Sequence, residues 1–315
     1  MKKIIISFFL FLGLSLQAQS VKFAVIADIH QDIMYDAEVR LQNFLEAAKV
    51  NKVDFIIELG DFCQAVDRNI PFVNLWNSFD GGKYHVLGNH EMDVCDKSES
   101  MKFYNMRYRY YSFDKGDFRF IVLDPNNILV DGEYKSPFKS GHYGDQIDTE
   151  QLDWLKKELA STNKKCVVFS HQSLERPKAV HNSYLVREIF EEENAKVGYA
   201  KIIAAFSGHD HTDYQKIING IAYIQINSAS NKWVGDKYKC ESRYSDSINK
   251  THPYIKYTIP YSESLYGIVT LKKNSLMMKG KKSDFVSPTP AELNIPSTFL
   301  HGPIVSFISD FRFEF

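Results

Sequence analysis

Residues 84–91 of the chain have the sequence YHVLGNHE, a short apolar segment that runs into four polar positions. Residues 84–87 predict a β-strand, and Gly88 allows the sharp turn that ends it. The motif Gly88-Asn89-His90-Glu91 then places an amide, an imidazole and a carboxylate side by side. Such a string is expected by chance in fewer than about one chain in a thousand. The stretch therefore predicts a functional loop at the end of a strand.

Four further polar clusters follow apolar segments in the same way. They are Asp28-Ile29-His30, Gly60-Asp61, Ser170-His171 and Gly208-His209-Asp210-His211. A Gly-Asp pair alone is a routine turn, and a single histidine is more often structural than a ligand. In open α/β sheets, however, the loops at the carboxyl ends of the strands face one crevice. Carboxylate, imidazole and amide ligands suit divalent ions such as Mn, Fe or Zn, so the ordered combination predicts a metal site.

Short apolar runs alternate with amphipathic segments, which indicates α/β layers. We expect strands at residues 23–27, 53–59, 84–87, 118–123, 166–169, 202–206, 222–226 and 265–277. One helix is expected at 36–49, where Leu41, Phe44, Leu45 and Ala48 share a face. A second is expected at 148–160, where Asp148 can cap the first turn and Gln151 follows three residues later, as in a capping box. These patterns leave the strand order open.

Composition limits the classes of partner. The chain has 315 residues, of which 44% are hydrophobic and 14% aromatic, enough to bury the core of one large domain. Its formal net charge is -1, and no basic stripe is present. We therefore expect no nucleic-acid partner, and a nuclease is disfavoured. A small phosphorylated substrate remains compatible with this charge, because bound metal ions can supply positive charge locally.

The first 19 residues have the pattern of an export signal. Two lysines precede an apolar stretch at residues 4–16, and Ala18 fits the position before the cleavage point. The stretch is shorter than the roughly 20 residues that span a bilayer, although an uncleaved anchor is the alternative. No later segment is apolar for long enough to be a transmembrane helix. We expect a periplasmic or extracellular protein with a single domain at 20–315, whose tail from about residue 285 wraps the surface.

The four cysteines, Cys63, Cys95, Cys166 and Cys240, lack the spacing of a thiolate metal site, so none is predicted to be a ligand. Export permits disulfides, and four cysteines allow three full pairings among which the sequence does not choose. Cys166 lies in an apolar run at residues 166–169, which favours a buried free thiol at that position.

With these five clusters, from Val21 to about Ile226, the chain resembles the calcineurin-like metallophosphoesterase family. The resemblance implies a four-layer α/β/β/α sandwich, two mixed sheets flanked by helices, that hydrolyses a phosphate ester or anhydride. It implies that one divalent ion is held by Asp28, His30, Asp61 and His211. A second ion would be held by Asp61, Asn89, His171 and His209, with the Asp61 carboxylate bridging the two.

The same resemblance implies a mechanism. Two cations roughly 3.5–4 Å apart share a water and lower its pKa, and the resulting hydroxide attacks phosphorus. Asn89 and His90 would contact the phosphate, and His90 would assist the leaving oxygen, oriented by Glu91 or Asp32. One departure is visible, because family members often carry Asp or Asn a few residues after the bridging aspartate. Here Phe62-Cys63-Gln64 follows, and Gln64 carries no charge.

The substrate is less constrained. Residues 84–91, 110–113, 118–120 and 151–155 look like the branch that contains manganese-dependent ADP-ribose/CDP-alcohol diphosphatases, which implies a nucleoside-diphosphate-type substrate. Three aromatic residues, Trp233, Tyr238 and Tyr244, could stack a base or simply pack a C-terminal loop. His142, in the Gly-rich loop at 140–144, is a candidate substrate contact or a surface residue.

The remaining histidines, His85, His181, His252 and His301, follow no ligand pattern and are interpreted as structural. A rival function is a non-catalytic scaffold built on the same fold. Such proteins typically lose ligand residues, whereas every expected ligand and His90 are present in this sequence.

Overall fold

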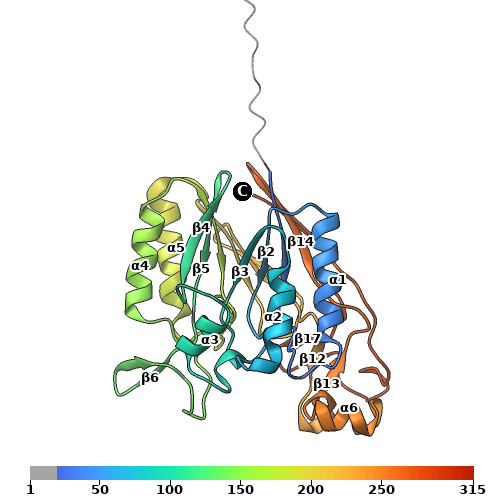
Figure 1. Ribbon diagram of the computed structural model, residues 1–315. Helices are drawn as coiled ribbons and strands as arrows, with labels where there is room; N and C mark the ends of the chain where they lie inside the picture. The colour runs from blue at the N-terminus through green and yellow to red at the C-terminus, as the bar shows by residue number, and fades with distance from the viewer. Residues whose placement is uncertain (1–19) are drawn as a thin grey trace, which may run out of the picture.

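Two six-stranded sheets pack face to face at the centre of the molecule, with helices on both outer faces (Figure 1). The computed structural model describes residues 20–315, so the predicted export signal at residues 1–19 lies outside the described residues. Helices α4 and α5 cover one side and α1 and α2 the other, which gives four layers. The predicted four-layer α/β/β/α sandwich of two mixed sheets is therefore confirmed.

The first sheet has the strand order β18-β15-β14-β1-β2-β3. Its parallel part is β1 (Val21–Ile26), β2 (Phe55–Glu58) and β3 (Gly82–His85). The antiparallel part is β14 (Gly267–Lys272), β15 (Ser275–Gly280) and β18 (Phe311–Glu314), so the end of the chain forms the outer edge of this sheet.

The second sheet has the order β10-β11-β9-β8-β5-β4. Its central strands β11 (Ile221–Gln225), β9 (Ile202–Ser207), β8 (Lys165–Phe169) and β5 (Phe118–Val122) run parallel. The edge strands β10 (Tyr214–Ile218) and β4 (Tyr111–Lys115) are antiparallel to their neighbours. Three two-stranded ribbons lie outside the sheets: β6 (Ile128–Val130) with β7 (Glu133–Lys135), β12 (Asn231–Trp233) with β13 (Thr258–Pro260), and β16 (Thr298–Phe299) with β17 (Gly302–Pro303).

Six α-helices occur in the part of the chain that is described. They are α1 (Ala37–Val50), α2 (Ile70–Asn77), α3 (Lys97–Phe103), α4 (Thr149–Ala160), α5 (Ser183–Val197) and α6 (Asp246–Thr251). Asp148 caps α4 as predicted, because its carboxylate accepts a 2.9 Å hydrogen bond from the backbone N–H of Gln151. The reciprocal half of the capping box is absent, since the Gln151 side chain binds the backbone of Asp124 instead.

The central strands are apolar on both faces because each face is covered. In β1, Phe23 and Val25 point into the space between the sheets, whereas Ala24 and Ile26 pack toward α1 and α2. A strand covered on both sides has an almost continuous apolar sequence rather than an alternating one. This explains why the central strands were recognisable as short uninterrupted apolar runs.

One strand prediction is wrong in its extent. Residues 265–277 form a hairpin instead of a single strand, since β14 ends at Lys272 and β15 begins at Ser275. The turn lies in the polar run at residues 272–275, which separates the apolar residues of the two strands. Within residues 20–315, no helix is long and apolar enough to cross a membrane. All four cysteines are buried and free.

Phe23 holds the two sheets together. Its ring stacks on Phe55 at 5.0 Å and meets Phe120, Phe169 and Phe206 edge-on, each at 5.8 Å. We expect Phe23→Ala to lower the free energy of unfolding by about 3–5 kcal/mol, measured by urea denaturation. Val39→Ala, on the exposed face of α1, should change it by less than about 0.5 kcal/mol. A loss below about 1 kcal/mol at Phe23 would contradict this role.

Candidate metal centre

The five polar clusters of the sequence meet where the two sheets present the carboxyl ends of their strands. Asp28 and His30 follow β1, Asp61 follows β2 and Asn89 follows β3 in the first sheet. In the second sheet, His171 follows β8, and His209 and His211 follow β9. The loops after β1 and β2 are tied together by backbone hydrogen bonds from Asp28 N to Gly60 O and from His30 N to Asp61 O, of 3.1 and 3.0 Å.

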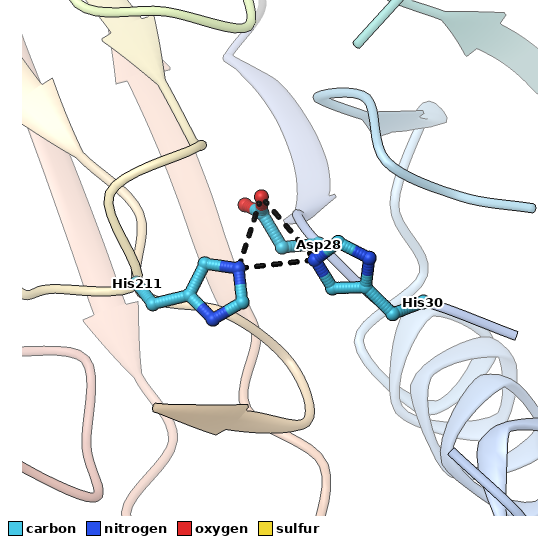
Figure 2. A group of neighbouring side chains, drawn as sticks. All are labelled: Asp28, His30 and His211. Carbon is cyan, nitrogen blue, oxygen red and sulfur yellow. Dashed lines mark hydrogen bonds and ion pairs between the residues drawn. The ribbon is translucent and has the colours of Figure 1, made fainter. Parts of the chain in front are cut away.

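Three of these side chains, Asp28, His30 and His211, form a first group whose ligand atoms all lie within 4.8 Å of one another. Figure 2 shows the two imidazoles and the carboxylate pointing toward a common point. The Nε2 atoms of the two histidines are 3.0 Å apart, and Asp28 Oδ1 lies 3.5 Å from His211 Nε2 and 4.0 Å from His30 Nε2.

A second group consists of Asp61, His171 and His209, again with ligand atoms within 4.8 Å. His171 Nε2 lies 3.2 Å from Asp61 Oδ2 and 3.1 Å from His209 Nδ1. Asn89 joins this group, because its Oδ1 is 3.0 Å from the same nitrogen. Asp61 also approaches the first group, with Oδ2 3.9 Å from His30 Nε2. The seven predicted residues are therefore brought together, and Asp61 lies between the two groups.

These spacings fit metal ligands. Two nitrogens bonded to one ion at about 2.1 Å and at right angles to each other lie about 3.0 Å apart. The ring tautomers also fit, since His211 Nδ1 donates to the Asn231 carbonyl at 2.8 Å and His171 Nδ1 to the Leu59 carbonyl at 2.7 Å. Each of these bonds leaves Nε2 of the neutral ring as the lone pair that faces the group.

The site also favours positive charge. Burial alone would raise the pKa of Asp61, but His171 and His90 outweigh it and hold that pKa well below its usual value. Burial would lower the pKa of His171, yet Asp61 outweighs burial and raises it to about 10. For His30, burial dominates and lowers the pKa to about 3. Ionised carboxylates beside imidazoles in a buried site suit divalent cations, and a bound cation would take the place of the proton on His171.

The backbone of the site is strained. Asp28, His30, Asp61, His209 and His211 all have left-handed conformations, with φ between 47° and 73°. Such angles are uncommon for residues other than glycine and cluster at functional sites. The five residues lie in the loops after β1, β2 and β9, and their side chains meet in the two groups.

Hydrogen bonds from buried groups hold the two aspartates. Asp28 accepts from the backbone N–H of His209 at 2.9 and 3.1 Å, and Asp61 Oδ1 accepts from the backbone N–H of His90 at 2.9 Å. Glu91 is fully buried behind Asp61 and accepts from the backbone N–H groups of Asp61 and Phe62 at 3.2 and 2.8 Å. Glu91 therefore positions the Asp61 loop, which explains why it cannot serve His90.

His90 lies at the edge of the two groups, with its ring 5.4 Å from that of His30. Its Nδ1 is 2.7 Å from Asp93 Oδ2 and 3.3 Å from Tyr143 Oη. The sequence-based suggestion of Glu91 or Asp32 as its acidic partner is thus wrong. Burial would lower the pKa of His90, but Asp61 and Asp93 outweigh it and raise the pKa to about 9.

Asp32 has another task. Its carboxylate accepts from the backbone N–H of Gln64 at 2.6 Å and from Arg68 and Asn69 at 2.8 and 2.9 Å. It therefore fixes the segment that follows the uncharged Gln64. The signal for the true partner of His90 was local, because Asp93 lies three residues after His90, across one turn of a short 3₁₀ helix.

A cleft of about 1500 Å³ opens over the two groups. Tyr143 lines it, whereas its neighbour His142 is exposed and is not among the lining residues, so the substrate contact predicted for His142 stays a prediction. Trp233 also lines the cleft. Tyr238 packs on Phe299 instead, at 5.2 Å.

Two residues that the sequence analysis did not assign to the site belong to the cleft wall. His301, interpreted as structural, lines the cleft with its ring 6.4 Å from that of His209. Lys232 lines it as well, and burial lowers the pKa of Lys232 to about 8. No periodicity or spacing in the sequence signals either residue, since long-range folding alone brings them to the site.

Comparison with known proteins gives an independent result. The sequence model of the family described as "Calcineurin-like phosphoesterase" matches residues 21–213, more than half of the chain. No curated protein matches the sequence.

Among solved structures, a dimetal phosphatase from Danio rerio is similar, with a TM-score of 0.59 and 14% identity over 85% of this chain and 99% of that chain. GAP50, the anchor in the inner membrane complex of Plasmodium, is similar with a TM-score of 0.52 and 16% identity over 91% of this chain and 89% of that one. At such identities these likenesses concern the fold alone.

Gly88 lies where the loops after β2 and β3 approach each other closely. A Cβ at this position would lie closer than 3.0 Å to Asp61 N, Asp61 Oδ1 and Glu91 Oε2. We expect Gly88→Ala to displace the Asp61 carboxylate and lower the bound metal per protein at least about twofold, measured by plasma mass spectrometry of dialysed protein. The control is Gly198→Ala, which strains a helix end but meets no atom within 4 Å and should keep the metal content. Unchanged metal in Gly88→Ala would contradict the expectation.

Proposed function

Because this chain belongs to the calcineurin-like phosphoesterase family, it is a metal-dependent phosphoric ester hydrolase, and we propose that it works with two divalent ions. In this proposal Asp28, His30, Asp61 and His211 hold one ion. The other is held by Asp61, Asn89, His171 and His209. The substrate is a small phosphate ester or anhydride that enters the cleft over the two groups.

The observation that carries the proposal is the position of Asp61 between the two groups. Its Oδ2 lies 3.2 Å from His171 Nε2 and 3.9 Å from His30 Nε2, so one carboxylate reaches both. When bound, the ions would stabilise the charge on the phosphoryl oxygens and lower the pKa of a water enough for it to act as the nucleophile. The mixture of nitrogen and oxygen ligands favours Mn, Fe or Zn.

His90 is the proposed general acid. Its ring lies beside the first group. The Nδ1 atom of this ring is hydrogen-bonded to the carboxylate of Asp93. The other nitrogen, Nε2, is then free to give a proton to the leaving oxygen of the substrate. Asp93 and Tyr143 act as positioning residues, because both contact Nδ1 and hold the ring in one orientation.

A nucleoside-diphosphate-type substrate is the second candidate. Three aromatic residues line the cleft, Trp233, Tyr257 and Tyr254. The ring centroid of Tyr257 lies 5.7 Å from that of Trp233 and 6.3 Å from that of Tyr254. Aromatic rings that line a cleft can stack a base, which contributes about 1–3 kcal/mol. The cleft is also much larger than a single phosphate needs.

The direct test measures hydrolysis of p-nitrophenyl phosphate, bis-p-nitrophenyl phosphate, ADP-ribose and CDP-choline by metal-stripped protein to which Mn, Zn or Fe is added back. We expect activity to return with at least one metal, since the ions supply both the nucleophile and charge stabilisation. Highest turnover on the two diphosphates would favour the second candidate. A protein that binds no metal under any of these conditions would contradict the proposed function.

His90→Ala separates metal binding from chemistry. We expect two metals to remain bound and kcat to fall by about 10²-fold or more, because only the proton donor is lost. Asp61→Ala is the matched comparison and should lose both metal and activity, since the shared carboxylate disappears. Metal content by plasma mass spectrometry is read together with kcat. Full activity in His90→Ala would exclude the role given to it.

A further inference from the structure

The part of the chain after the family match builds one wall of the cleft. The match ends at residue 213, whereas Lys232, Trp233, Tyr257 and His301 all line the cleft. Residues of the matched segment line the same cleft, such as His90 after β3 and Tyr143 in the loop between β7 and α4. The predicted metal ligands thus all lie within the matched residues. The wall formed by Lys232, Trp233, Tyr257 and His301 lies outside the match.

Lys232 is the most unusual residue of this wall. It lines the cleft, yet only 1% of its surface is exposed to solvent. An ammonium group has three N–H donors. Among residues 20–315, its one hydrogen-bond partner is the carbonyl oxygen of Asp210, at 3.2 Å. A buried lysine with unused donors beside a cleft is costly unless an anion completes its shell.

Lys232, Arg176, Asp210 and His301 form a small charged cluster. The carboxylate of Asp210 is already engaged by the guanidinium of Arg176, and His301 Nδ1 lies 3.4 Å from its other oxygen. With Lys232 and Arg176 positive and Asp210 negative, the formal sum is +1 when His301 is neutral. Asp210 is thus shared between Arg176, His301 and Lys232, which leaves the ammonium of Lys232 only partly compensated.

This cationic cluster adjoins the metal centre. Asp210 lies between His209 and His211 in the chain, and the Asn231 carbonyl that precedes Lys232 accepts the hydrogen bond of His211. His301 is carried by the turn between β16 and β17, where the Pro303 carbonyl accepts a 3.1 Å hydrogen bond from Thr212. An anion at Lys232 would therefore lie in the same cleft as a phosphoryl group at the metal centre.

We propose that Lys232 and His301 form a subsite for a second anionic group of the substrate, a phosphoryl group joined to the one that is hydrolysed. This inference rests on the proposed function and narrows it to substrates with two adjacent phosphoryl groups. Lys232 donates its free N–H groups to the second phosphoryl oxygens, and His301 contacts them from the rim of the cleft. A monoester fills only the metal centre.

The test compares two inhibitors of p-nitrophenyl phosphate hydrolysis by the metal-loaded protein, inorganic phosphate and imidodiphosphate. In Lys232→Met, the inhibition constant for imidodiphosphate should rise about tenfold or more, and that for phosphate less than about threefold. Lys232→Arg should retain most of the wild-type preference for imidodiphosphate over phosphate. Metal chelation by imidodiphosphate in solution is the same for every variant, so it cancels in these ratios.

His301→Ala is a second variant, at an exposed position where misfolding is not a concern. It should raise the inhibition constant for imidodiphosphate about threefold. Lys256→Met is the matched control, because Lys256 lies on the same segment but pairs with Glu241 outside the cleft. Equal changes in both inhibition constants, or none in either variant, would overturn the subsite. A wild type that binds no metal would contradict the proposed function instead, whereas one that binds metal but does not hydrolyse the reporter leaves the subsite to a binding measurement. Calorimetric titration of the metal-loaded protein and Lys232→Met with imidodiphosphate then decides the subsite alone, with equal affinities overturning it.

Discussion

The structure of the site depends on two buried carboxylates, Asp28 and Asp61. Both need more positive charge nearby than the surrounding side chains provide. Both are almost completely shielded from water. Ionised groups are tolerated in such places only when they are paired or bind metal. The histidines beside them offer lone pairs, because their outer nitrogens are held by backbone carbonyls. Two such groups of ligands suit divalent cations.

A cation site of this kind needs ligands from both sheets at a single point. Strained backbone in the loops brings these ligands together. Left-handed angles at Asp28, Asp61 and His209 turn each side chain sharply where its strand ends. Such conformations cost about 1–3 kcal/mol each and persist only where the surroundings enforce them. The large aromatic core between the sheets, centred on Phe23, supplies the rigid frame. The buried Glu91 then holds the Asp61 loop in place.

Much of this could be predicted from the sequence because the information is local. Uninterrupted apolar runs marked the central strands, and polar clusters directly after them marked the loops that carry Asp28, Asp61 and His171. What could not be predicted depends on contacts across the chain. Lys232 and His301 reach the cleft only through the fold of the C-terminal half, and Asp93 was overlooked although it is close to His90 in sequence. The hairpin of β14 and β15 did leave a local signal, the polar run at residues 272–275, which the prediction of one strand ignored.

Each group draws its members from both halves of the sandwich, and this has a consequence for biogenesis. Asp28 and His30 emerge from the ribosome early, whereas their partner His211 is made after about two thirds of the chain. A growing polypeptide therefore presents half-sites that cannot hold an ion firmly. Stable binding of the proposed ions would therefore have to follow the docking of the two sheets. Loss of the ions would, by the same linkage, loosen the joint between the halves.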